Sequence, residues 1–216
     1  MIEIKYKLKF KSDFHFGSGA GIPGVIDCGL KYNSNGVPEI SGRTIKGILR
    51  DAVENIVLLQ PPGLSMVEKI EEKIFGKQGE DSTKFRFSTP VLEEQCEKRI
   101  SRSRNLQKSI TKIEFHNRID RENNIAEKGA LFSREAGPKY FEYIGSISQI
   151  KDCLDDKKLK RYIYYLICGM RFVTHIGGNR RRGKGLVRFE IEEIKDKDNG
   201  KTFNFKEIIK KGIEKR

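Results

Sequence analysis

The segment from Ile176 to Arg188 combines two residue types that suit the binding of phosphate groups. Four glycines are interleaved with four cations and no acidic residue, namely Gly177, Gly178, Gly183, Gly185, Arg180, Arg181, Arg182 and Lys184. Glycine lets the backbone come close to a ligand, where its N–H groups can form a nest for an anion. Arginine adds planar forks that match phosphate oxygens. The segment predicts a grip on a sugar-phosphate backbone, the alternative being a tight hairpin with solvated arginines.

A second glycine-bearing segment follows the first predicted strand and contains His15, Gly17 and Gly19. A histidine titrates near neutral pH, so His15 could act as a general base in RNA cleavage. It could also bind a phosphate, or simply be structural. We expect His15, Gly17 and Gly19 to contact RNA.

Asp27 lies further along the same turn-rich region. A carboxylate beside a bound RNA phosphate could hold Mg²⁺ or orient an attacking 2′-hydroxyl group. The residues alone also allow an ordinary turn aspartate. Asp27 is the candidate catalytic residue.

A helix start offers a third possible phosphate site. Ser41 is a typical N-cap, and the first turns of a helix present unsatisfied N–H groups and a positive dipole end. Arg43, Lys46 and Arg50 recur at spacings of three and four residues and share one face. These four residues predict phosphate binding, and a capped helix with a solvated edge is the alternative.

The composition favours a polyanionic partner. Lys and Arg total 43 against 30 Asp and Glu, a net charge of +13 over 216 residues, and nucleic acid is the commonest such partner. The four cysteines form no CxxC pair, which argues against a zinc ribbon and fits a reducing cytoplasm. We expect neither a signal peptide nor a membrane span, and hence a cytoplasmic protein without a membrane partner.

The hydrophobic periodicity predicts an α+β fold. Expected strands lie at 2–11, 84–91, 139–147 and from Val187, and expected helices at 41–59, 65–76 and 155–170, the second opened by a capping box of Ser65 and Glu68. This order suits a ferredoxin-like βαββαβ core, with an antiparallel sheet and helices on one face, in a single domain over 1–216. The basic, serine-rich stretch 98–118 predicts an insertion that could be mobile.

Together these segments resemble the RAMP (repeat-associated mysterious protein) superfamily of CRISPR systems, and most closely the backbone subunit of type III effector complexes. Four motifs carry the resemblance in the expected order: His15–Gly19, Pro38–Arg50, Arg118–Arg121 through Glu135, and Ile176–Gly185. One departure is Arg43-Thr44, where the family commonly has a pair of small residues.

The resemblance implies an RNA-recognition-type ferredoxin fold with an inserted thumb hairpin at about 92–138. It implies self-association along a guide RNA, with target RNA and other effector subunits as partners. In active relatives an aspartate at the position of Asp27 cuts the paired target RNA with Mg²⁺ or another divalent metal. The sequence identifies no residue as a metal ligand.

Three alternatives remain open at this point. A metal-independent CRISPR RNA-processing endonuclease would use His15 as its base. A non-catalytic structural subunit would bind guide RNA and cut nothing. A ribosomal or general RNA-binding module would form no filament on guide RNA.

Overall fold

The computed structural model describes residues 1–59, 69–77, 83–150, 156–204 and 208. The predicted capping box of Ser65 and Glu68 lies outside these residues.

The core of the fold is an antiparallel sheet built around β1 (Ile2–Phe10). β1 pairs with β8 (Glu142–Gln149) on one side and with β9 (Val187–Asp196) on the other. β2 (Phe85–Phe87) and the short β3 (Val91–Leu92) both pair with β8. The order β2-β8-β1-β9 is that of a ferredoxin-like core, which confirms the predicted fold class.

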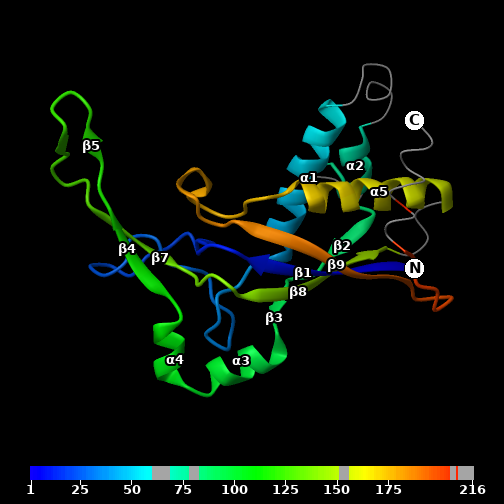
Figure 1. Cartoon of the computed structure of the whole chain (residues 1–216), viewed down its shortest axis with the longest axis horizontal. Coiled ribbons are helices and arrows are strands. Elements are labelled where there is room, and N and C mark those ends of the chain that lie inside the picture. Colours follow the sequence, from blue (N-terminus) through cyan, green and yellow to red (C-terminus); the bar gives the residue numbers. More distant parts are fainter. Residues whose placement is uncertain (60–68, 78–82, 151–155, 205–207, 209–216) are drawn as a thin grey trace.

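Three helices cover one face of this sheet: α1 (Gly42–Leu58), α2 (Ile70–Phe75) and α5 (Asp156–Phe172) (Figure 1). Ser41 caps α1 as predicted, because its side chain accepts a hydrogen bond from the N–H of Thr44. α5 comes close to α1 at Gly169, where a Cβ atom would lie 3.1 Å from Val53 Cγ2. The buried core lies between these helices and the sheet.

The opposite face of β1 carries alternating lysines, each of which forms an ion pair. Lys5 lies 3.5 Å from Glu193, Lys7 lies 3.3 Å from Glu192, and Lys9 lies 2.8 Å from Glu190. Acidic side chains of β9 therefore neutralise much of the positive charge on this face of the sheet.

The chain between β3 and β8 forms α3 (Glu94–Ser101), α4 (Arg104–Ser109) and a projecting arm, which we define as residues 112–136 (Figure 1). The base of the arm pairs β4 (Lys112–His116) with β7 (Phe132–Ala136), and its tip pairs β5 (Ile119–Asp120) with β6 (Ile125–Ala126). The hairpin expected from Arg118 to Glu135 is therefore present.

One sequence prediction about elements was wrong and another gains detail. The stretch 98–118, expected as an insertion, contains helical turns: buried Ile100 anchors α3, and the hydroxyl of Ser103 caps α4 by accepting from the N–H of Leu106. The strand expected at 84–91 is divided into two strands, β2 and β3. Between them, the N–H of Ser88 donates to the carbonyl oxygen of Ser146 on β8, and Ser88 Oγ accepts from the N–H of Ser146 in place of a backbone carbonyl group.

Candidate nucleic-acid interface

The glycine-rich loop, residues 177–185, presents its arginines on an exposed turn. Arg180–Arg182 form one short 3₁₀ turn, η1, between two residues in the left-handed region, Asn179 at φ 59° and Gly183 at φ 75°. All three arginine side chains are exposed, and Arg182 Nη1 lies 3.1 Å from His116 Nδ1 on the arm. This geometry leaves the guanidinium groups of Arg180 and Arg181 directed to solvent.

The glycines of this loop close it onto the N-terminal segment. A Cβ on Gly185, at φ 71°, would lie 1.9 Å from the carbonyl oxygen of Ile176, and a Cβ on Gly177, at φ 87°, would lie 2.5 Å from that of His15. The N–H groups of Gly178 and Gly185 donate to the carbonyl oxygens of His15 and Asp13, at 2.9 and 2.7 Å. These two N–H groups are already used within the protein and cannot donate to a bound anion.

His15 lies in the joint between this loop and the arm. Its side chain is buried, and Nδ1 lies 2.6 Å from the carbonyl oxygen of Glu135, so the ring donates a proton there. Burial lowers the pKa of His15, which keeps the imidazole neutral. Its ring also lies 3.1 Å from the Cβ position of Gly17 and 3.2 Å from that of Gly178. His15 thus packs against the glycine-rich loop, whereas Gly17 and Gly19 are both exposed, and Gly19, at φ 82°, has open space around it.

Lys184 is held in a cluster of ion pairs. Its ammonium group lies 2.6 Å from Glu114 Oε1 on β4 and 3.3 Å from Asp13 Oδ2, and Lys112 reaches the same two carboxylates at 3.0 and 2.6 Å. Burial opposes ionisation of Asp13 and Glu114, but the two lysines outweigh it and hold the pKa of both carboxyl groups below the ordinary value. Lys184 therefore fastens the loop to the arm.

Asp27 is exposed, and Ser133 of β7 fixes its carboxylate. The backbone N–H of Ser133 donates to Asp27 Oδ2 at 2.6 Å, and the Ser133 hydroxyl lies 3.0 Å from the same oxygen. The N–H and then the hydroxyl of Ser133 lower the pKa of Asp27, so it is ionised at neutral pH. The sequence alone did not indicate Ser133, because a serine inside a strand carries no recognisable motif.

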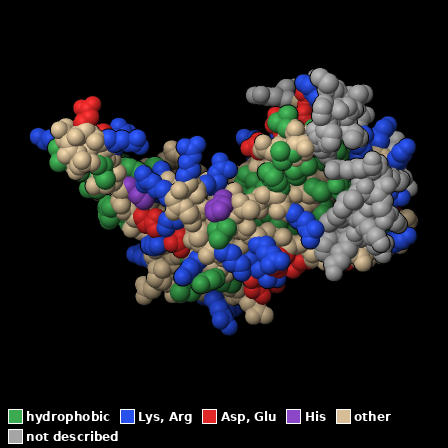
Figure 2. All heavy atoms as spheres, turned by 45° about the horizontal axis from the view of Figure 1, so that its top comes forward, with side chains coloured by type: hydrophobic (Ala, Val, Ile, Leu, Met, Phe, Trp, Pro, Cys, Tyr) green, Lys and Arg blue, Asp and Glu red, His purple; other side chains and the backbone are tan. Residues whose placement is uncertain are grey.

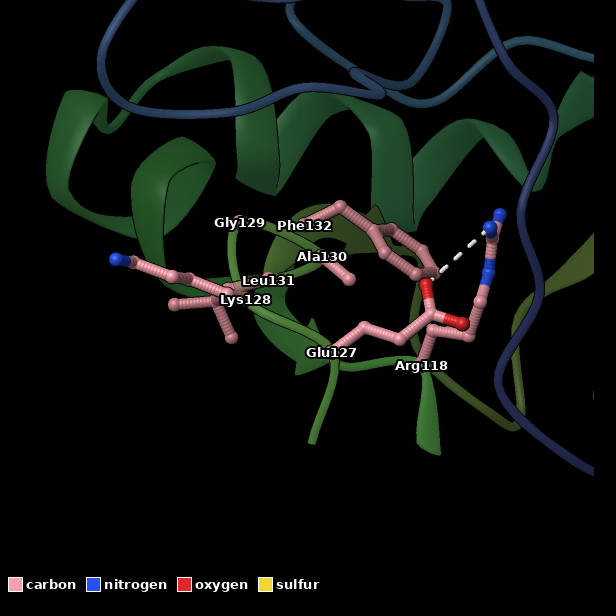
Figure 3. A pocket seen from close by; sticks show the side chains of 7 residues that line it. All are labelled: Arg118, Glu127, Lys128, Gly129, Ala130, Leu131 and Phe132. Atoms are coloured by element: carbon pink, nitrogen blue, oxygen red, sulfur yellow. Dashed lines mark hydrogen bonds and ion pairs between the residues drawn. The ribbon is translucent and has the colours of Figure 1, made fainter. Parts of the chain in front are cut away.

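Two hollows meet at Phe132, at the start of β7. One, of about 340 Å³, is lined by Arg118 and by residues 127–132 of the arm; Figure 3 shows it with Arg118 turned toward Glu127, 3.4 Å away. The other, of about 320 Å³, lies between Phe132 and residues 179–182. An aromatic ring between basic groups is an arrangement that suits RNA, in which bases stack and phosphates pair with cations.

The remaining candidate residues lie at the N-cap of α1 or within this helix: Ser41, Arg43, Lys46 and Arg50. Gly42 is against the carbonyl groups of Phe87 and Ser88, beside β2. Arg50 donates to the carbonyl oxygen of Gly76 and lies over the ring of Phe75, so its charge serves the contact between α1 and α2. Arg43 is exposed and Lys46 is half-buried. The structure brings residues 13–17, 177–185 and the arm together, and the contacts described for Ser41, Gly42 and Arg50 are with Thr44, with the chain beside β2 and with the end of α2.

The space-filling view agrees with this arrangement. Lys and Arg side chains gather on the face that lies between the arm and the helices, around the place where the glycine-rich loop meets the arm (Figure 2). Acidic side chains occur next to them at the base of the arm, where Asp13 and Glu114 lie in the ion-pair cluster.

The side chains available as ligands decide whether the protein could hold the predicted divalent metal ion. Within residues 1–59, 69–77, 83–150 and 156–204, no group of three or more His, Cys, Asp or Glu side chains could hold a metal ion. Asp27 offers one ionised carboxylate. Mg²⁺ is commonly held by one or two carboxylates together with substrate phosphates and water, so the site fits such an ion only when RNA supplies further oxygens.

In the part of the chain that the structure describes, no helix has both the length and the apolar character needed to cross a bilayer.

Comparisons with known proteins agree on one family. Residues 7–188 match the RAMP superfamily. No curated protein matches the chain. Among the solved structures that resemble it are a chain of type III-B Cmr-beta in the apo state (TM-score 0.67) and one of type III-B Cmr-beta bound to cognate target RNA (TM-score 0.66). Each is 13% identical, over 88% of this chain and 96% of the other. At this identity the likeness concerns the fold.

Proposed function

Since this chain belongs to the RAMP superfamily, we propose that it is a backbone subunit of a type III CRISPR ribonucleoprotein. In this proposal it binds guide RNA through phosphate contacts, and Asp27 cleaves the paired target RNA. The RNA-bound state of one similar structure, type III-B Cmr-beta with cognate target RNA, supports a partnership with RNA and with other effector subunits. Self-association along the guide belongs to the same proposal.

One structural observation carries this proposal. Phe132 lines the hollow beneath Arg180–Arg182, and the next residue, Ser133, holds Asp27. Successive side chains of a strand point to opposite faces. β7 therefore separates a cationic, aromatic surface from an ionised carboxylate. If the guide strand lay on the cationic, aromatic surface, the target strand paired with it could pass beside the carboxylate of Asp27.

The guide strand would be held without reading its sequence. Arg180 and Arg181 are exposed forks that suit phosphate oxygens. Phosphate contacts position a nucleic acid and carry no sequence information, so the target would be selected by base pairing with the guide.

The cleavage chemistry requires a base beside a 2′-hydroxyl group. The carboxylate of Asp27 would accept the 2′-hydroxyl proton as that oxygen forms a bond to the adjacent phosphorus and the bond to the 5′-oxygen breaks. The leaving 5′-oxygen would take a proton from water, so the products are a 2′,3′-cyclic phosphate and a 5′-hydroxyl. A divalent cation, when bound by Asp27 and RNA oxygens, would stabilise the negative charge on the phosphate.

A non-catalytic structural subunit is the second candidate. The observation in its favour is that, among the described residues, no group of three or more His, Cys, Asp or Glu side chains could hold a metal ion at Asp27 or elsewhere. The metal-independent endonuclease has less support, because His15 is buried and its Nδ1 proton is committed to the carbonyl oxygen of Glu135.

Native purification followed by sequencing of the co-purified RNA tests the assignment to CRISPR. Short RNAs that share a repeat-derived 5′ tag, together with other effector subunits, are the expected result. Bulk ribosomal RNA would instead indicate a general RNA-binding module and overturn the proposal.

A further inference from the structure

Asp27 and Ser133 form a reciprocal pair across 106 residues of sequence. The N–H of Asp27 donates to Ser133 Oγ at 3.0 Å, and the N–H of Ser133 donates to Asp27 Oδ2 at 2.6 Å. The hydroxyl of Ser133 lies 3.0 Å from the same carboxylate oxygen and 3.2 Å from the carbonyl oxygen of Val25. One serine thus contacts both the backbone and the side chain of Asp27.

The backbone beyond Asp27 continues this attachment to β7. The N–H of Cys28 donates to the carbonyl oxygen of Ser133, and the N–H of Glu135 donates to that of Cys28, at 3.2 and 3.0 Å. Leu30 N–H then donates to Glu135 Oε2 at 3.0 Å. Residues 27–30 therefore run beside β7, with a single parallel bridge between Cys28 and Arg134.

The environment of Ser133 is unusual for a residue that only solubilises a strand. Its side chain is buried, with 6% of its surface exposed, whereas the carboxylate it contacts belongs to an exposed residue. The hydroxyl is therefore satisfied inside the protein. Oδ2 of Asp27 faces inward, and among the described residues no partner contacts Oδ1.

We propose that Ser133 is a positioning residue for Asp27, whose hydroxyl fixes the carboxylate so that Oδ1 faces the RNA. This inference rests on the proposed function, because it assigns a role to Ser133 in the cleavage attributed to Asp27. Groups that hold a reacting side chain in one orientation commonly matter nearly as much as the side chain itself. Since Ser133 belongs to the arm, the position of the arm also sets the position of Asp27.

The experiment uses the assembled ribonucleoprotein with a guide and its matched target RNA. The variants are Ser133→Ala, Ser133→Thr, Asp27→Ala and the double variant Asp27→Ala with Ser133→Ala. Ser109→Ala is the matched control, because that serine is exposed on α4 and its hydroxyl donates only to Leu106 O. Single-turnover cleavage and target-binding affinity are measured separately, and hydrogen exchange follows the amide of Asp27.

We expect Ser133→Ala to slow cleavage about 10- to 100-fold with target affinity unchanged, since a small misplacement of a reacting group can have that effect. Ser133→Thr keeps the hydroxyl and should restore the rate to within about threefold. The double variant should be no slower than Asp27→Ala, because the two residues act as one unit. The Asp27 amide should exchange faster in Ser133→Ala and as in the wild type in Ser133→Thr and Ser109→Ala.

Two outcomes separate the inference from the function on which it rests. If Asp27→Ala abolishes cleavage while Ser133→Ala cleaves at the wild-type rate, Ser133 does not position Asp27 and only this inference fails. If Asp27→Ala itself cleaves normally, the proposed cleavage function fails and the inference fails with it. Should Ser133→Ala not assemble, Ser133→Cys retains the shape of the side chain with a weaker donor, and an unchanged rate in that variant would overturn the inference.

Discussion

Lys184 Nζ lies 2.6 Å from Glu114 Oε1, which joins the glycine-rich loop to the first strand of the arm. Asp13 and Lys112 complete the cluster. Two segments 70 residues apart in sequence therefore share one charged contact. The position of the arginine turn and the position of the arm depend on each other through it.

The first prediction concerns this contact. Lys184→Ala and Glu114→Ala should each destabilise the chain, and a double-mutant cycle should give a coupling energy of about 1 kcal/mol, because both side chains are less than a third exposed and share their partners. Denaturant unfolding of the four proteins measures it. A coupling energy near zero would mean that the ion pair contributes nothing to the docking of the loop.

The second prediction separates the exposed arginines from Lys184. Replacing Arg180 and Arg181 by Ala should weaken RNA binding for all sequences and make the slope of log affinity against log salt shallower by about 1 to 2. The reason is that fewer counterions are released from the RNA on binding when two phosphate contacts are missing. Filter binding at several salt concentrations measures the slope.

The matched control for this pair is Lys157→Ala with Lys160→Ala. These two lysines are exposed on α5, at the end of the helix away from the loop (Figure 1). Replacing them removes the same amount of positive charge as replacing Arg180 and Arg181. The control should change the slope little. Equal effects of the two double variants would show that net charge, and not the arginine turn, binds RNA.

The fold was predictable from sequence because its elements carry strong periodic signals. The alternation in β1 and the apolar stripe of α1 each report burial on one side, and Ser41 marks the helix start. The stretch 98–118 was not predictable in this way. Its short helices are held by Ile100 and Ser103 against other parts of the chain, and such contacts leave no period in the sequence.

The candidate site was predictable in its parts and not in its arrangement. Glycine and arginine types indicated the loop, but tertiary contacts decide that Lys184 is ion-paired and that Arg50 contacts α2. Ser133 and Phe132 acquire their roles only because β7 passes between Asp27 and the arginine turn. Both residues lie within the segment from Arg118 to Glu135, but the sequence of that segment does not indicate which of its side chains contact Asp27 or the arginine turn.

The third prediction compares two glycines of the loop. Gly185 and Gly183 both have positive φ, at 71° and 75°, but only Gly185 has a backbone atom, Ile176 O, within 1.9 Å of its Cβ position. Gly183→Ala should cost about 1 kcal/mol for the left-handed conformation alone. Gly185→Ala should cost at least about 3 kcal/mol, because the loop must open. Urea unfolding measures both, and equal effects would contradict the close approach seen at Ile176.

The fourth prediction concerns divalent metal. EDTA should abolish target cleavage by the assembled particle, and excess Mg²⁺ should restore it, because a single carboxylate at Asp27 needs a cation to stabilise the phosphate charge. Guide RNA binding should persist in EDTA, since it depends on arginines. Cleavage that survives EDTA and is lost in His15→Gln would instead favour the metal-independent endonuclease.

The fifth prediction is a pH dependence of stability caused by His15. Burial lowers the folded-state pKa of His15 below its ordinary value of 6.5, so the unfolded chain binds a proton more readily than the folded one. The contribution of His15 to stability is therefore complete above pH 6.5 and decreases as the pH falls from 6.5 toward the folded-state pKa. Asp13 and Glu114, with lowered pKa values, lose their contribution only at more acidic pH.

His15→Gln keeps a donor for the carbonyl oxygen of Glu135 and removes the titration. We expect the wild type to lose more stability than this variant between pH 7.5 and pH 5, although the variant is less stable at pH 7.5 because an amide fills the joint less well than the imidazole. Urea unfolding at a series of pH values measures the difference. Parallel stability curves for the two proteins would show that His15 is not the buried neutral base that its contacts with Glu135 and Gly178 indicate.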